Sequence, residues 1–151
     1  MIKPPSIIAE YSLIYSGDSA LNLPADPKEA AAALDRARET NQWQSLLKEG
    51  EMPTLFHVRP LYGSLHTWFI GEVNRRGMVQ KESVEFALRL VLERIDNFGP
   101  FKVGHTTDEG QRIATTETID AIYAAPDGRA IVEELGLLIL VRAQQGLPGK
   151  S

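Results

Sequence analysis

The chain has 151 residues, a net charge of −4 and no cysteine. Its apolar and charged fractions, 43% and 24%, are typical of one folded domain. The lack of cysteine excludes disulfides, thiolate metal sites and cysteine nucleophiles, and an acidic balance without a basic patch argues against nucleic acid as a partner. No apolar run approaches the roughly 20 residues that span a bilayer, and MIKPPSII carries no signal-peptide pattern, so we expect neither membrane insertion nor secretion.

Residues 1–24 read as an extended, β-rich arm. Pro4 and Pro5 favour extended backbone, and the mostly apolar segment Ile7–Tyr15 follows, as one strand or as a hairpin returning through residues 20–23. This segment has no evident partner strand in the chain, so we expect it to bind neighbouring molecules, for example by adding a strand to an exposed sheet edge. The candidate interaction residues are Ile7, Ile8, Tyr11, Leu13 and Tyr15 in the arm, and Arg59 in the body.

The body begins with a helix whose start is well marked. Asp26 is a suitable N-cap and Pro27 suits the first helical position, whereas Thr40-Asn41 is a point where the helix can break. Thr54–Leu61 then predicts a strand, in which Pro60 either ends regular pairing or indicates a sheet edge.

Two helices are predicted next. The first runs from Gly63-Ser64 to Arg75-Arg76-Gly77. The second, Ser83–Phe98, has an apolar stripe at three- to four-residue spacing that Leu90 and Leu92 widen, which is typical of a central helix. Leu90 and Leu92 leave open the alternative that this wide face is an oligomer interface.

The last third predicts a β-hairpin over Phe101–Ala114, a short helix over Glu117–Ala124 and a final helix over Arg129–Gln145. The predicted fold class is α+β, with three to four main helices packed on a small, mostly antiparallel sheet and with the extended N-terminal arm. A mainly α fold is the alternative. Residues 25–146 form the single domain, and residues 147–151 form a tail.

No motif for chemistry is present. The histidines His57, His66 and His105 lack metal-site spacing, and no nucleophile elbow occurs. We therefore predict no catalytic, cofactor-binding or metal site and no enzymatic activity. The alternative is a small bacterial enzyme or ligand-binding domain with a pocket around His57, Arg59 and His66, because His57 and Arg59 share one face of the predicted strand.

The order of elements in residues 54–151 resembles that of a group of small tailed-bacteriophage proteins from the structural gene cluster. The matching features are an Arg-Pro-Leu strand, a helix end with Asn-Phe, a glycine-containing hairpin, a Thr-Ile-Asp segment and a short tail. In this chain they are Val58-Arg59-Pro60-Leu61, Arg94-Ile95-Asp96-Asn97-Phe98-Gly99, Glu109-Gly110, Thr118-Ile119-Asp120 and Lys150-Ser151.

The resemblance implies a structural or assembly role in the virion, at the head, neck or tail, without catalysis. The expected partners are copies of the chain itself and other virion proteins, and the expected location is the virion, assembled in the host cytoplasm. The group also includes tail-assembly chaperones, so a chaperone that binds the tape-measure protein is the alternative.

Overall fold

The computed structural model describes residues 11–98, 105–106, 112–113 and 116–144. The fold is α+β, as the sequence predicts. The helices in the described residues are α1 (Pro27–Thr40), α2 (Ser64–Arg76), α3 (Gln80–Val91), α4 (Thr116–Ala124) and α5 (Gly128–Gln144). The strands in the same residues are β1 (Tyr11–Leu13), β2 (Leu55–Val58), β3 (Leu92–Asp96), β4 (His105–Thr106) and β5 (Arg112–Ile113).

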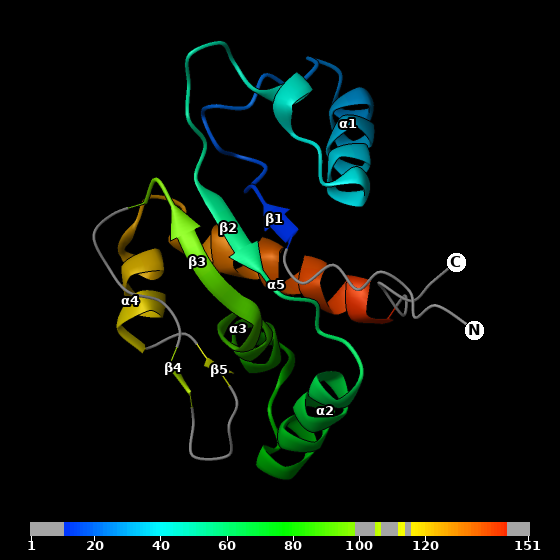
Figure 1. Ribbon diagram of the computed structural model, residues 1–151, viewed down its shortest axis with the longest axis vertical. Helices are drawn as coiled ribbons and strands as arrows, with labels where there is room; N and C mark the ends of the chain where they lie inside the picture. Colours follow the sequence, from blue (N-terminus) through cyan, green and yellow to red (C-terminus); the bar gives the residue numbers. More distant parts are fainter. Residues whose placement is uncertain (1–10, 99–104, 107–111, 114–115, 145–151) are drawn as a thin grey trace, which may run out of the picture.

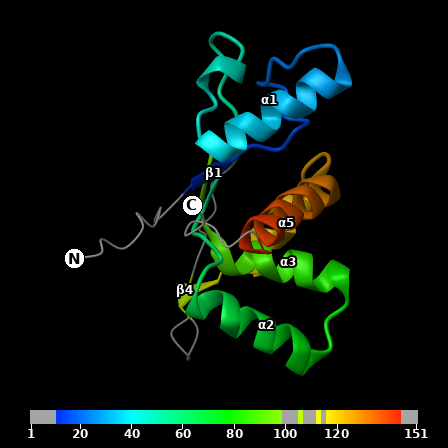
Figure 2. The same ribbon diagram turned by 90° about the vertical axis from the view of Figure 1, so that its right-hand side faces the viewer.

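The main sheet has the order β1-β2-β3 and is antiparallel throughout. Because side chains alternate along a strand, one face of the sheet packs into the main core, and the other carries the polar residues Ser12, His57 and Asp96 beside Leu55, which packs against a smaller apolar cluster. Tyr11, Leu13, Phe56 and Val58 belong to the main core, which α3 and α5 complete on that face (Figures 1 and 2). The register pairs Ser12 with His57 on the opposite face.

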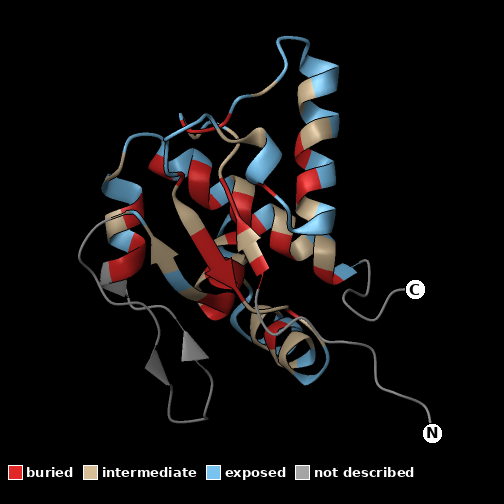
Figure 3. Cartoon of the chain, turned by 45° about the horizontal axis from the view of Figure 1, so that its top comes forward, coloured by how far each residue is buried: buried red, intermediate tan, exposed pale blue. Residues whose placement is uncertain are grey.

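The packing of α3 on α5 forms the centre of the core. Leu88, Leu135 and Ile139 are at most 1% exposed. Figure 3 shows that the buried positions are concentrated at the centre of the molecule, on the strands and the helices around them (Figure 3). A Cβ added at Gly136 would lie 2.5 Å from the carbonyl oxygen of Val84, so the two helices approach too closely there for any side chain at position 136.

A second, smaller cluster holds α1 against the N-terminal segment. Its buried members are Ile14, Leu21, Leu34, Ala37 and Trp43. The helix begins after Asp26 with proline in its first turn, which confirms the predicted start. It ends at Asn41, whose φ of 56° is left-handed, at the point where the sequence allows a break.

The predicted helix Ser83–Phe98 is wrong in its second half. The helix α3 ends at Val91 and the chain continues directly as β3. The end of α3 is stabilised by Arg59, whose guanidinium donates to the Leu90 carbonyl (2.9 Å from Nη2) and whose amide donates to the Val91 carbonyl (2.9 Å). Leu90 and Leu92 are buried in the core of the same chain, so the alternative prediction that this helix face is an oligomer interface is wrong.

The expectation that the arm lacks a partner strand is also wrong. Tyr11–Leu13 pairs with β2, and Tyr11, Leu13 and Ile14 are at most 3% exposed. The strand β2 is central, so Pro60 ends pairing and does not mark a sheet edge. The hairpin strands β4 and β5 pair with each other in a separate sheet and do not join the main one.

Candidate functional site

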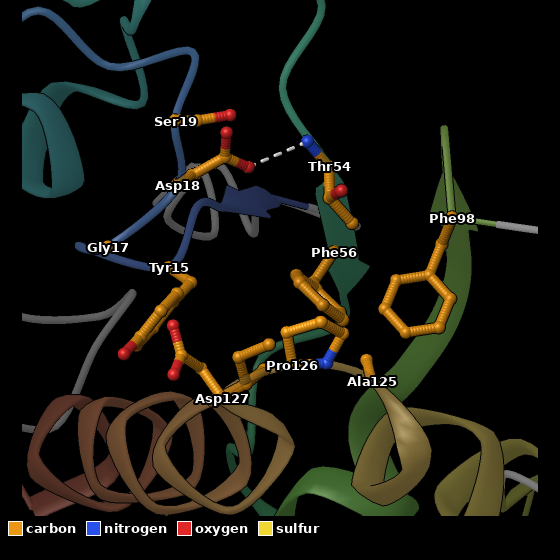
Figure 4. Close-up of a pocket in the computed structure, with 11 residues that line it drawn as sticks. Tyr15, Gly17, Asp18, Ser19, Thr54, Phe56, Phe98, Ala125, Pro126 and Asp127 are labelled. Carbon is orange, nitrogen blue, oxygen red and sulfur yellow. Dashed lines mark hydrogen bonds between the residues drawn. The ribbon is translucent and has the colours of Figure 1, made fainter.

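A pocket of about 310 Å³ lies where two turns meet the end of the main sheet. The turn after β1 forms one side and the turn between α4 and α5 forms the opposite side, as Figure 4 shows (Figure 4). We call it the turn pocket. Its lining residues are Tyr15, Gly17, Asp18, Ser19, Thr54, Phe56, Phe98, Ala125, Pro126, Asp127 and Ile131.

The walls of the turn pocket are aromatic. Phe56 and Phe98 meet edge to face with their ring centroids 6.1 Å apart. The Tyr15 ring lies against Gly17, where any Cβ would come within 2.6 Å of a ring carbon. Gly17 therefore allows the Tyr15 ring to lie flat against the turn and to form the third aromatic wall.

Asp18 is a structural member of the pocket. One of its carboxylate oxygens accepts the Ala20 amide and the other accepts the Thr54 amide, each at 2.9 Å. The second bond joins the turn after β1 to the start of β2 and is drawn in Figure 4. Both carboxylate oxygens of Asp18 are thus already used to hold the fold together.

Asp127 has no such role. Its carbonyl accepts the Ile131 amide (2.9 Å), so its backbone starts α5, but its φ is 61°, in the left-handed region. An aspartate that caps a helix ordinarily has extended backbone and turns its carboxylate onto the first amides. Figure 4 shows the Asp127 carboxylate directed away from the α5 ribbon and toward Tyr15. In the described part of the chain this carboxylate forms no hydrogen bond or ion pair.

Tyr15 is a neutral hydrogen-bonding group at neutral pH. Desolvation, together with the nearby carboxylates of Asp127 and Glu134, raises the pKa of its phenol. Glu134 itself accepts hydrogen bonds from the amide (2.7 Å) and the hydroxyl of Ser16. It also forms an ion pair with Arg38 at 3.3 Å. These contacts anchor α5 to the turn that carries Tyr15.

A second polar constellation crosses the main sheet on its other face. Ser12 Oγ lies 3.1 Å from His57 Nδ1, and His57 Nε2 lies 2.7 Å from Asp96 Oδ2. The three residues come from β1, β2 and β3 in turn. The hydrogen bond to His57 is the main reason that the pKa of Asp96 is lowered.

Ser12, His57 and Asp96 are the residue types of a hydrolase triad, but the site lacks the free main-chain amide and the buried aspartate that such a triad needs. The Ser12 amide donates to Asn41 Oδ1 (3.0 Å), and the Ser12 carbonyl accepts Trp43 Nε1 (3.3 Å). The main-chain amide at the nucleophile, which often forms an oxyanion hole, is therefore already occupied. The Asp96 side chain is 46% exposed, whereas the triad aspartate is buried. The constellation fits a cross-strand clamp that holds the register of the sheet.

The sequence-predicted interaction residues are dispersed by the structure. Tyr11 and Leu13 lie in the core, Tyr15 lines the turn pocket, and Arg59 is half-buried at the end of α3. Ile7 and Ile8 lie outside the described residues. His57 bonds to Ser12 and Asp96, Arg59 binds the end of α3, and none of His57, Arg59 and His66 lines the turn pocket.

Asp18, Asp127 and Phe98 were not predicted as site residues. Ser16-Gly17-Asp18 and Pro126-Asp127-Gly128 are each recognisable as turns from their residue types. No local pattern shows that two turns so far apart in the chain meet. In the described ranges, no group of three or more histidine, aspartate or glutamate side chains could hold a metal ion.

Comparison of the chain with protein-family models, with curated proteins and with solved structures found no match. Within the described ranges, none of the helices combines the length and the apolar character needed to cross a bilayer.

Proposed function

We propose that the protein is a structural or assembly component of a tailed-bacteriophage particle that acts through contacts with copies of itself and with other virion proteins. The proposal begins from the resemblance of residues 54–151 to small phage structural proteins. The structural observation that supports it is an exposed apolar surface on the outer side of α5.

This outer surface of α5 consists of Leu137 and Val141, one helical turn apart and 42% and 48% exposed. Beside them, Leu137 and Val84 line a groove of about 240 Å³ together with Lys81 and Glu133. Single exposed apolar residues are normal on a monomer. Two neighbouring exposed apolar side chains next to a groove that is lined by one cation and one anion make this side of α5 a candidate protein contact.

The decisive experiment is mass spectrometry of purified particles from the phage or prophage that encodes the chain. We expect the protein in stoichiometric amount in intact particles. Its absence from particles, combined with co-purification with the tape-measure protein from lysed host cells, would favour the chaperone alternative. Absence from both would overturn the phage proposal and leave a ligand-binding or enzymatic domain.

A matched pair of variants tests the outer surface of α5. Leu137→Glu places a charge in this apolar surface, and Ala130→Glu places the same charge at another exposed position of α5. We expect Leu137→Glu to prevent incorporation into particles while Ala130→Glu is incorporated normally. Both variants should retain the circular dichroism spectrum of the parent chain, and equal incorporation of the two would contradict a role for this surface.

A further inference from the structure

The charged residues that line the turn pocket are all acidic. Of its eleven lining residues, Asp18 and Asp127 are the charged ones, and no lysine or arginine is among them. Glu134 lies close enough to Tyr15 to raise the pKa of that phenol, although Arg38 partly neutralises it. An anionic ligand is therefore disfavoured, and a cation is the complementary ligand.

The two aspartates differ in what they can still accept. Both oxygens of Asp18 hold backbone amides, whereas the Asp127 carboxylate has no such contact in the described residues. The strained left-handed backbone of Asp127 directs this carboxylate toward the pocket wall and away from the helix amides that it would normally cap. A single free carboxylate suits one organic cation, while a hard metal ion requires several oxygen ligands.

The walls indicate which kind of cation fits. The partly exposed rings of Tyr15 and Phe98 offer apolar contact to an aliphatic stem, and the Tyr15 ring lies beside the Asp127 carboxylate, where a cationic head would also meet an aromatic surface. The volume of about 310 Å³ is at the low end of the roughly 300–1,000 Å³ found for ligand pockets, which suits one side chain better than an extended molecule.

We propose that the turn pocket binds the side chain of an arginine or lysine on an exposed segment of a partner protein, with Asp127 as the counter-ion. This inference rests on the proposed function, because it names the chemistry of one contact with a virion partner. A small free amine has the same head group, so the experiment must distinguish the two sources.

The test is an NMR titration of the isotope-labelled full chain with four probes. They are the capped tripeptides acetyl-Gly-Arg-Gly-amide, acetyl-Gly-Lys-Gly-amide and acetyl-Gly-norleucine-Gly-amide, and butylammonium chloride. Norleucine keeps the aliphatic stem and lacks the charge. We expect the two basic peptides to shift the amide signals of Gly17 and Asp127, and the norleucine peptide to bind about tenfold more weakly, as the loss of one charge-assisted contact implies.

Two variants assign the charge to one residue. Asn is tolerated in left-handed backbone, so Asp127→Asn should fold as the parent chain does, with thermal melting as the check. Asp120→Asn makes the same change of side chain and net charge at an exposed position of α4 outside the turn pocket. We expect Asp127→Asn to weaken binding of the arginine peptide about tenfold and Asp120→Asn to leave it unchanged.

Three results would overturn the inference. Equal binding of the norleucine peptide would mean a purely apolar pocket, and equal weakening by the two variants would mean unspecific charge attraction. Binding of butylammonium without either basic peptide would assign the pocket to a small amine. These measurements use the isolated chain, so they are independent of the mass spectrometry of particles. If no basic peptide binds but the protein is present in particles, only the pocket assignment is removed. If the peptides bind but the protein is absent from particles, the phage proposal is removed.

Discussion

The two faces of the main sheet hold the molecule together by different means. On one face Tyr11, Phe56 and Val58 are at most 3% exposed and belong to the main apolar core together with residues of α3 and α5. On the other face Ser12, His57 and Asp96 connect the same three strands by side-chain hydrogen bonds.

The two faces make different contributions: the apolar face supplies stability, and the polar face fixes the register of the strands. Apolar burial is non-directional and contributes in proportion to area, so the apolar face supplies most of the free energy of folding. Hydrogen bonds between partly exposed side chains contribute little net energy, yet they require one alignment of the strands. Ser12 and His57 lie directly opposite each other on β1 and β2. Their backbone groups point away from each other, since the Ser12 amide and carbonyl bind Asn41 and Trp43 at the outer edge of β1.

The largest expected effect comes from removing β1, which breaks both faces together. Deletion of residues 1–23 removes the buried Tyr11, Leu13 and Ile14, and each such side chain contributes about 1.5–3 kcal/mol by burial. Against a total stability of about 5–15 kcal/mol, we expect the truncated chain to lose its cooperative thermal transition. Circular dichroism and sedimentation measure this. A truncated chain that melts cooperatively would restore the detachable arm that the sequence suggests.

Leu88→Ala breaks the apolar face alone. Leu88 is fully buried in α3, and cutting a buried leucine to alanine costs about 2–5 kcal/mol, because the lost transfer energy and the cavity add. Leu137→Ala is the matched control, since Leu137 is 42% exposed and should change the free energy of unfolding by no more than about 0.5 kcal/mol. Urea denaturation of both variants checks the difference, and similar losses would mean that α3 is not central to the core.

Local signals predicted much of this fold. The start of α1 after Asp26 and the end of α2 at Gly77, whose φ is 61°, depend on residues within one turn, so the sequence predicts them correctly. The α+β class and the hairpin pairing of β4 with β5 also follow from local patterns.

The failures share one physical cause, which is pairing between distant segments. The stripe of Val84, Leu88, Val91 and Ile95 keeps helical spacing past the true end of α3, so periodicity alone extends the helix. What converts residues 92–96 into a strand is β2, which pairs with Ile95 through Phe56. The turn pocket was missed for the same reason, because Asp127 acquires its neighbours from the turn after β1.

Gly136→Ala tests how closely α3 and α5 must approach behind the apolar face. Alanine is the better helix former by about 1 kcal/mol, but its Cβ would meet the Val84 backbone, and overpacking costs about 1–3 kcal/mol. We expect a net destabilisation. Gly71→Ala in α2 is the control, because nothing lies within 4 Å of the added Cβ, and it should stabilise by about 0.5–1 kcal/mol. Thermal melts with the same sign for both variants would contradict the close approach.

Asp96→Asn tests the polar face and should have the smallest effect. The hydrogen bond from His57 lowers the pKa of folded Asp96 below its unfolded value of about 3.9, so its contribution is present above that pH and is lost as the pH falls through the folded pKa. Because the Asp96 side chain is 46% exposed, we expect a contribution below about 1 kcal/mol. The free energy of unfolding should therefore differ between parent and Asp96→Asn at pH 6, and the difference should shrink steadily as the pH falls below about 3.9. Asp120→Asn, at an exposed position of α4, controls for net charge, and a difference for Asp96→Asn that stays constant over this acid range would show that the carboxylate charge does not hold the three strands in register.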